Sequence, residues 1–116
     1  MNNIRKQRVE SAIRREISTL ILRDLKDPRI GFVSVTHVSL TNDLRIAHVY
    51  VSIMGDNEAK EKSMEGLKSA SGFIRKQVGD VIKLRYTPEI IFKLDDTQEE
   101  RERIMKLLKT IEDERK

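Results

Sequence analysis

The sequence predicts an α+β fold, in which a small three-stranded mixed sheet has helices packed on one of its faces. Two observations predict this class. Apolar residues recur every three or four positions in three long segments, as they do in amphipathic helices. Three shorter segments, rich in Val, Ile, Ser and Thr, have the character of strands. The length of 116 residues indicates one domain, 1–116, and the 4% of aromatic residues indicates a mostly aliphatic core.

The first expected element is a helix over about residues 3–25. Its apolar residues, from Val9 to Ile21, follow the i, i+4, i+8 spacing of one helical face. Pro28 ends the helix, because proline restricts the residue before it and has no N–H to donate. Four arginines lie well round the helix from the apolar face: Arg5, Arg8, Arg15 and Arg23.

Two strands follow and form a hairpin. Residues 32–40 read as the first strand, and a change of alternation after Val35 indicates a bulge. Residues 44–54 read as the second strand, joined to the first by a turn at 41–43. So short a connection makes the two strands antiparallel. Residues 55–57 close the hairpin and can cap the next helix.

The next helical segment covers residues 57–83, and its middle contains four small residues in a row, 69–72. A run of small residues that includes a glycine is unfavourable in a helix interior, so a break or kink is expected there. The third strand is expected at 89–94, after Pro88. A last helix, about 97–114, is expected to begin with a capping box of Thr97 and Glu100.

Positive charge is concentrated in two separate segments. The net charge is +4 over residues 1–30 and +4 over residues 68–93, whereas residues 31–67 and 94–116 each carry −2. If folding brings the two basic segments together, the protein has one basic face suited to nucleic acid. The alternative is that solvated helices are simply rich in Lys and Arg, and charge alone does not decide between the two.

Catalysis and metal binding find little support. The chain has no cysteine, which excludes disulfides and thiolate zinc sites. His37 and His48 lie on neighbouring strands without a carboxylate cluster at ligand spacing, and no nucleophile has a base nearby. The expectation is therefore a binding protein without cofactor or metal. No signal peptide and no apolar run of membrane-spanning length is found, which indicates a cytoplasmic protein.

Aromatic side chains offer few surfaces for base stacking. Phe32, Phe73 and Phe92 lie in apolar patterns and are expected in the core. Tyr50 and Tyr86 are the remaining candidates for exposed rings. With so few rings, recognition of the nucleic-acid backbone and shape is favoured over reading of individual bases.

The order of elements, α-β-β-α(kink)α-β-α, resembles the type II KH domain, which clamps single-stranded nucleic acid at a GXXG loop between two helices. Residues 69–72 take the place of that loop and contain no GXXG. A KH-like domain with an Ala-x-Gly kink resembles the ribosome-binding factor A family. The likeness extends over about residues 3–113 and includes the segments LKDPR (25–29), DLRIA (43–47) and KLRYTPE (83–89).

The resemblance implies a bacterial assembly factor that acts as a monomer. Such a factor binds the free small (30S) ribosomal subunit and its 16S rRNA and supports late rRNA processing and subunit maturation, above all at low temperature. Two alternatives stay open. One is a generic KH-like module for single-stranded nucleic acid, and the other is a protein adaptor that uses the acidic last helix.

The candidate RNA-binding site is centred on the expected kink. A break there would leave backbone N–H groups without helical partners, and these suit a phosphate, which a glycine lets approach closely. The alternative is that the small residues only allow two helices to pack tightly. The candidate residues are Arg5, Arg8, Arg15, Lys68, Ser69, Ala70, Ser71, Gly72, Arg75, Lys76, Lys83 and Arg85.

Overall fold

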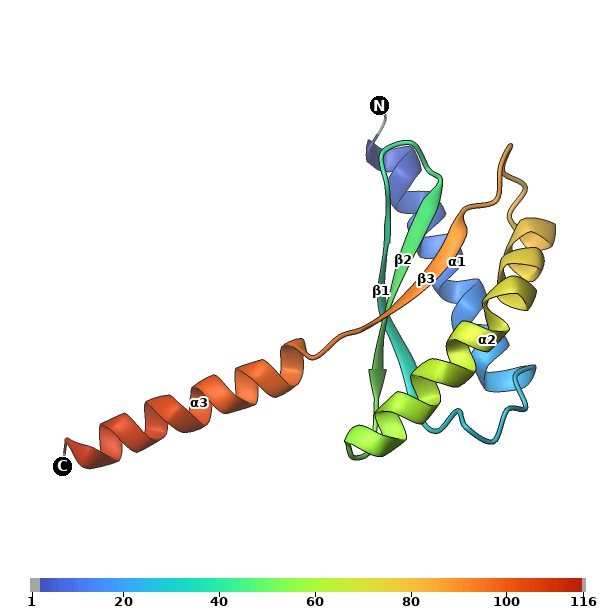
Figure 1. Ribbon diagram of the computed structural model, residues 1–116. Coiled ribbons are helices and arrows are strands. Elements are labelled where there is room, and N and C mark those ends of the chain that lie inside the picture. Colours follow the sequence, from blue (N-terminus) through green and yellow to red (C-terminus); the bar gives the residue numbers. More distant parts are fainter. Residues whose placement is uncertain (1–2, 116) are drawn as a thin grey trace.

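The computed structural model describes residues 3–115, and it has the six elements in the expected order (Figure 1). The α+β class is confirmed. Element bounds differ from the expected ones by a few residues. The elements are α1 (Asn3–Arg23), β1 (Val33–Leu40), β2 (Ile46–Ile53), α2 (Asn57–Val81), β3 (Glu89–Leu94) and α3 (Thr97–Glu114).

The strands form one mixed sheet in the order β1-β2-β3, antiparallel between β1 and β2 and parallel between β2 and β3. The expected bulge is confirmed, since the register of β1 against β2 shifts between Val35 and His37. The hairpin turn ends later than expected because Leu44 adopts a positive φ of 60°, which extended strands do not allow. The Asp43 carboxylate fixes this turn by accepting hydrogen bonds from the Thr41 hydroxyl and the Arg45 N–H.

The core lies between the sheet and two helices. Helices α1 and α2 cover one face, α1 over β1 and α2 over β3 (Figure 1). The core is almost entirely aliphatic, and Phe92 contributes an aromatic ring. The expectation for Phe32 and Phe73 is wrong, because they are 71% and 45% exposed. Phe32 precedes β1, whose core-facing residues begin with Val33, and its ring stays outside the core.

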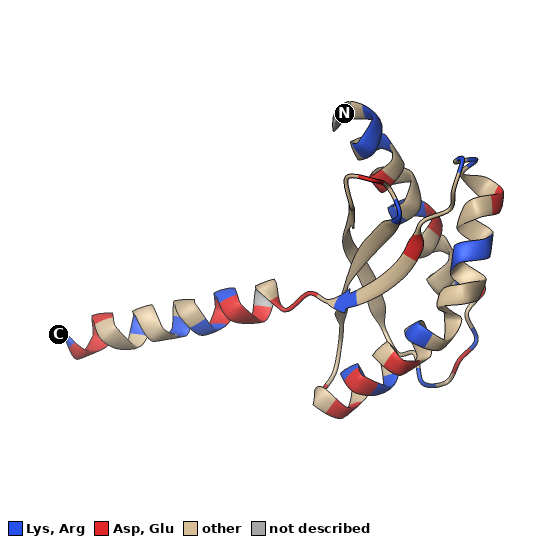
Figure 2. Cartoon of the chain, turned by 45° about the horizontal axis from the view of Figure 1, so that its top comes forward, with Lys and Arg blue, Asp and Glu red and all other residues tan. Residues whose placement is uncertain are grey.

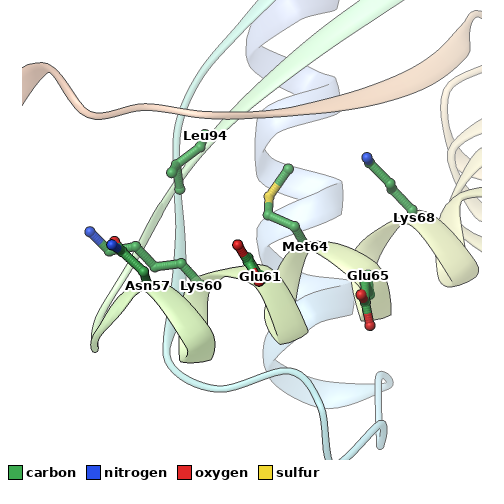
Figure 3. A pocket seen from close by; sticks show the side chains of 7 residues that line it. All are labelled: Asn57, Lys60, Glu61, Met64, Glu65, Lys68 and Leu94. Carbon is green, nitrogen blue, oxygen red and sulfur yellow. The ribbon is translucent and has the colours of Figure 1, made fainter.

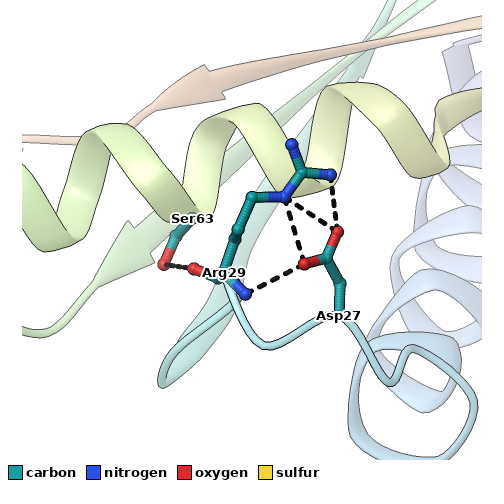
Figure 4. A network of polar contacts seen from close by, with 3 residues as sticks. All are labelled: Asp27, Arg29 and Ser63. Carbon is teal, nitrogen blue, oxygen red and sulfur yellow. Dashed lines mark hydrogen bonds and ion pairs between the residues drawn. The ribbon is translucent and has the colours of Figure 1, made fainter.

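The loop between α1 and β1 is fastened to α2 (Figure 4). The Asp27 carboxylate accepts hydrogen bonds from the guanidinium and the backbone N–H of Arg29, and these bonds lower the pKa of Asp27. The buried Ser63 hydroxyl of α2 donates to the Arg29 carbonyl and accepts from the Gly31 N–H. Gly66 lets the loop approach closely, since a Cβ there would lie 2.6 Å from Ile30 Cγ1.

The expected break in the second helical segment is absent, because α2 is one helix of 25 residues. Its axis bends near the middle instead (Figures 1 and 2). Two fully buried residues, Leu67 and Ile74, anchor the helix on either side of the small residues, and packing of this kind outweighs weak helix propensity. The Ser71 hydroxyl donates to the Lys68 carbonyl at 2.7 Å, a contact that bends helices.

Helix α3 extends away from the sheet (Figure 1). The Lys60 ammonium forms an ion pair with the Glu99 carboxylate at its start. The expected capping box is wrong: Thr97 is the first helical residue, and its N–H donates to the Asp95 carboxylate. The apolar stripe of α3 is exposed along its whole length: Ile104, Met105, Leu107, Leu108 and Ile111.

Candidate nucleic-acid interface

One side of α2 faces β3 and carries a row of four long side chains and one serine. The row consists of residues at helical spacings of three and four, which place them on a single side of the helix. We call it the α2 flank: Lys60, Met64, Lys68, Ser71 and Arg75. Leu67, Ile74 and Val78 of α2 are buried in the core, and we call the strip between the flank and β3 the groove. Two hollows open along this groove.

The first hollow, which we call the Met64 hollow, has a volume of about 500 Å³. Met64 and Lys68 point from α2 toward β3, and Leu94 points back toward α2 (Figure 3). Glu61 also lines the hollow, and the Lys60 ammonium is already paired with Glu99. The hollow therefore combines an apolar floor with mixed charge.

The second hollow, which we call the Tyr86 hollow, has a volume of about 540 Å³ and lies where β3 begins. The Arg75 guanidinium donates a hydrogen bond to the Thr87 carbonyl at 3.0 Å and so ties the end of α2 to the loop before β3. The Arg85 guanidinium lies over the Tyr86 ring, 5.6 Å from its centroid. The lining residues are Arg45, Ile46, Arg75, Tyr86, Thr87 and Glu89.

The structure brings some of the expected site residues together. Lys68 lines the Met64 hollow and Arg75 lines the Tyr86 hollow, while Lys76 lies next to Arg75 but about 100° further round α2. Ala70 is half-buried against the core, and Ser71 uses its hydroxyl on a backbone carbonyl. Apart from Ala70 and Ser71, the expected site residues are exposed to solvent: Arg5, Arg8, Arg15, Lys68, Ser69, Gly72, Arg75, Lys76, Lys83 and Arg85.

The continuous helix changes the chemistry expected at residues 69–72. Because these residues lie inside α2, their backbone N–H groups are part of the helical ladder and do not form a helix N-terminus. Gly72 is nevertheless accessible, since a Cβ at this position would meet no other atom within 4 Å. A phosphate at these residues would therefore be contacted by side chains, chiefly lysine and arginine.

The two basic segments reach the same end of the molecule. The start of α1, the tip of the β1–β2 hairpin and the loop between α2 and β3 all lie at the top of Figure 2. The Lys6 ammonium donates to the Asn42 side chain at 3.3 Å and holds the start of α1 against the hairpin. Arg5 and Arg8 lie on α1, whereas Lys83 and Arg85 lie in the α2–β3 loop.

Sequence reasoning missed several residues of the groove. Lys60 and Met64 share the four-residue spacing of Lys68, and this signal could have revealed them. Arg45 and Glu89 meet only because β2 and β3 pair in parallel, with the Glu89 N–H donating to the Arg45 carbonyl at 2.8 Å. No local sequence pattern predicts that pairing of β2 with β3.

Neither histidine has a metal-like environment. The His37 ring stacks on the Tyr50 ring with centroids 4.3 Å apart, and His48 Nδ1 is buried without a hydrogen-bond partner. Across residues 3–115, no group of three or more histidine and carboxylate side chains could hold a metal ion. Within the same range, no helix has the length and apolar character needed to cross a membrane.

Comparisons with known proteins agree on one family. A family model described as ribosome-binding factor A matches residues 5–108. A relative named ribosome-binding factor A, from Halothermothrix orenii, is 49% identical over 114 residues, which cover 98% of this chain and 93% of the relative.

Solved structures show the same fold. The solution structure of a Thermotoga maritima protein assigned as a ribosome binding factor A has a TM-score of 0.70 and 36% identity, and the match covers 80% of this chain and 89% of that one. A Thermus thermophilus ribosome binding factor A model, fitted into a map of a 30S complex, has a TM-score of 0.65 and 22% identity, and the match covers 77% and 93% of the two chains.

Proposed function

Since the chain belongs to the ribosome-binding factor A family, we propose that it binds the free small (30S) ribosomal subunit through 16S rRNA. In this proposal it supports late rRNA processing and subunit maturation, with the greatest need at low temperature. It acts in the cytoplasm as a monomer. It works by binding, without cofactor or metal.

The α2 flank is the observation that carries the RNA-binding proposal. Lys68 and Arg75 project from it beside a groove, and Lys83 and Arg85 continue the positive charge into the following loop. Lysine and arginine side chains neutralise phosphates and release counterions, which gives salt-dependent binding. The exposed Gly72 between Lys68 and Arg75 leaves room for an RNA backbone to approach the helix.

Charge reversal on α2 tests this proposal. The double substitution Arg75→Glu with Lys76→Glu changes the net charge by four units at exposed positions, so RNA is repelled, while the fold loses the Arg75 hydrogen bond to the Thr87 carbonyl. We expect the variant to lose most of its co-sedimentation with free small subunits at low salt. Thermal melting followed by circular dichroism checks the fold.

The matched control is Arg101→Glu with Arg103→Glu, an equal change of charge on the exposed α3. This control should co-sediment nearly as the parent protein does. Unaltered binding of the α2 variant would remove α2 from the site. Equal affinity of the parent protein for subunits and for arbitrary oligonucleotides would favour a generic single-stranded nucleic-acid module.

A second candidate function, a protein adaptor, is favoured by the exposed apolar stripe of α3. Acidic residues lie toward both ends of α3, at 99, 100, 102 and 112–114, and basic residues lie between them. Two copies of α3 would therefore place like charges together whether the helices paired in parallel or antiparallel. That charge pattern supports a monomer, and it favours binding of the apolar stripe to a different protein over binding to a second copy of this chain. A stoichiometric partner that survives nuclease treatment, and that Leu107→Ser with Leu108→Ser releases, would establish this function.

The control for the adaptor test is Lys106→Ser with Lys109→Ser, on the polar side of the same helix. An adaptor predicts that the partner stays bound to this control. If both variants behave as the parent does, the stripe does not hold a partner.

A further inference from the structure

The Tyr86 hollow has walls that are fixed before any ligand arrives. Thr87 lies directly against α2, where a Cβ added to Gly79 would meet its Oγ1 at 2.6 Å. Pro88 is among the most completely buried residues of the described chain, and the Arg75 guanidinium holds the Thr87 carbonyl at 3.0 Å. The two residues that follow Tyr86 are therefore held in place, and a wall that is already ordered loses little freedom on binding.

The Tyr86 ring is available for stacking. It is 72% exposed, although an aromatic side chain normally gains free energy by burial. Arg85 covers a ring face but does not line the hollow, so the guanidinium orients the ring from outside. Ile46, half-buried, adds an apolar side chain to the lining of the hollow.

The polar groups of the hollow are of two kinds. Arg45 and Arg75 are exposed cations with guanidinium N–H groups left to donate, since Arg45 has only a long contact of 4.0 Å with Asp43. Glu89 adds a carboxylate that can only accept hydrogen bonds. A free phosphate would be attracted by the arginines but repelled by the carboxylate. A ligand with an anionic part, a flat ring and an N–H edge would contact the arginines, the Tyr86 ring and Glu89, respectively.

We propose that the Tyr86 hollow binds one unpaired nucleotide of an RNA strand, a proposal that rests on the function given above. The base stacks on Tyr86, its phosphate lies against Arg45 and Arg75, and its N–H edge donates to Glu89. Guanine fits best, because its N1–H and N2–H groups lie side by side and match the two oxygens of a carboxylate. The volume of about 540 Å³ falls within the range of small-ligand sites and leaves room for the strand to enter and leave.

Tyrosine fluorescence can test this assignment directly. The chain has two tyrosines and no tryptophan, so Tyr50→Phe makes Tyr86 the only strong intrinsic fluorophore. The probe is a pentaribonucleotide with one central guanine between uridines, titrated at low salt. Stacking predicts saturable quenching. A pentamer whose central nucleotide is abasic should bind at least five-fold more weakly and quench little, because base–aromatic stacking contributes about five-fold or more in affinity.

Two substitutions complete the test, with affinity measured by anisotropy of the labelled pentamer. Tyr86→Ala should weaken binding of the guanine pentamer about tenfold and leave the abasic pentamer unaffected, whereas Tyr86→Phe should restore parent affinity. Glu89→Gln should reduce the preference for guanine over adenine at the central position. Since both side chains are exposed, melting curves should match the parent.

The proposal is overturned if Tyr86→Ala binds the guanine pentamer as the parent does, or if the abasic pentamer binds equally well. Equal affinity for free guanosine monophosphate would also overturn it, because the site would then serve a mononucleotide. The proposed function is tested separately by sedimentation with small subunits. Subunit binding with no effect of Tyr86 defeats only the pocket, whereas stacking without subunit binding defeats only the ribosomal role.

Discussion

Two glycines of α2 should respond in opposite ways to alanine. Both adopt ordinary helical backbone angles, since Gly55 is the described glycine with positive φ. In a helix interior, alanine is more favourable than glycine by about 1 kcal/mol. At Gly72 the new Cβ meets nothing within 4 Å, so Gly72→Ala should stabilise the protein by about 0.5–1 kcal/mol.

At Gly66 the same substitution forces a clash. The new Cβ would lie 2.6 Å from Ile30 Cγ1 and 3.4 Å from Asp27 Oδ2. Ile30 packs against the core and cannot easily move away. Overpacking of this kind costs about 1–3 kcal/mol, which exceeds the gain in propensity. Gly66→Ala should therefore destabilise the protein by about 1–2 kcal/mol.

Urea unfolding followed by circular dichroism at 222 nm measures both effects. With a urea m-value of about 1–3 kcal/mol/M, a change of about 1 kcal/mol shifts the urea midpoint by roughly 0.3–1 M. The midpoint of Gly72→Ala should rise and that of Gly66→Ala should fall. A rise for both variants would refute the close approach of the α1–β1 loop to α2. A fall for Gly72→Ala would mean that the bend needs glycine.

Three further predictions concern α3, Asp95 and Lys68. Deleting residues 97–116 should change the stability of the rest by less than about 1 kcal/mol in urea unfolding, because α3 meets the sheet domain mainly through one partly exposed ion pair and the hydrogen bonds of Thr97 to Asp95. A larger loss would show packing of α3 in solution. The hydrogen bond from the Thr36 hydroxyl, followed by those from Thr97, lowers the pKa of Asp95 from 3.8 to about 2. A depressed pKa stabilises the fold above pH 3.8, and this contribution disappears as the pH falls toward 2, so the parent and Asp95→Asn should differ most above pH 4 and converge near pH 2. A difference that is independent of pH would contradict the role of the carboxylate. Lys68→Gln should weaken subunit binding and reduce the slope of log affinity against log salt by about 0.7–0.9, the value for one phosphate contact. An unchanged slope would place Lys68 away from the RNA.

The elements and their order could be read from the sequence because amphipathic periodicity reflects burial directly. The bulge near Val35 appeared as a change in alternation, and the same change appears in the strand register. The expectation of a break in α2 was wrong because helix propensity is a local property, whereas Leu67 and Ile74 hold the helix through tertiary packing. The positive φ of Leu44 could not be predicted either, because it is a property of the folded turn.

The candidate site was predictable in part. Lys68 and Arg75 were found as basic residues near small ones, and both line hollows in the groove. Arg45 and Glu89 were missed because their meeting depends on the parallel pairing of β2 with β3. The last helix was expected from apolar periodicity, but a pattern does not show whether a helix packs within its own chain.

The measurement that tests the RNA-binding role of α2 most directly uses the absence of cysteine. A single Ser69→Cys places a unique thiol on the exposed side of α2, next to Lys68, and a tethered iron chelate there generates hydroxyl radicals. Ser34→Cys, on the open face of the sheet, is the control. In complexes with free small subunits, we expect strong, localised cleavage of 16S rRNA from position 69 and weak cleavage from position 34. No cleavage from position 69, or stronger cleavage from position 34, would contradict the account.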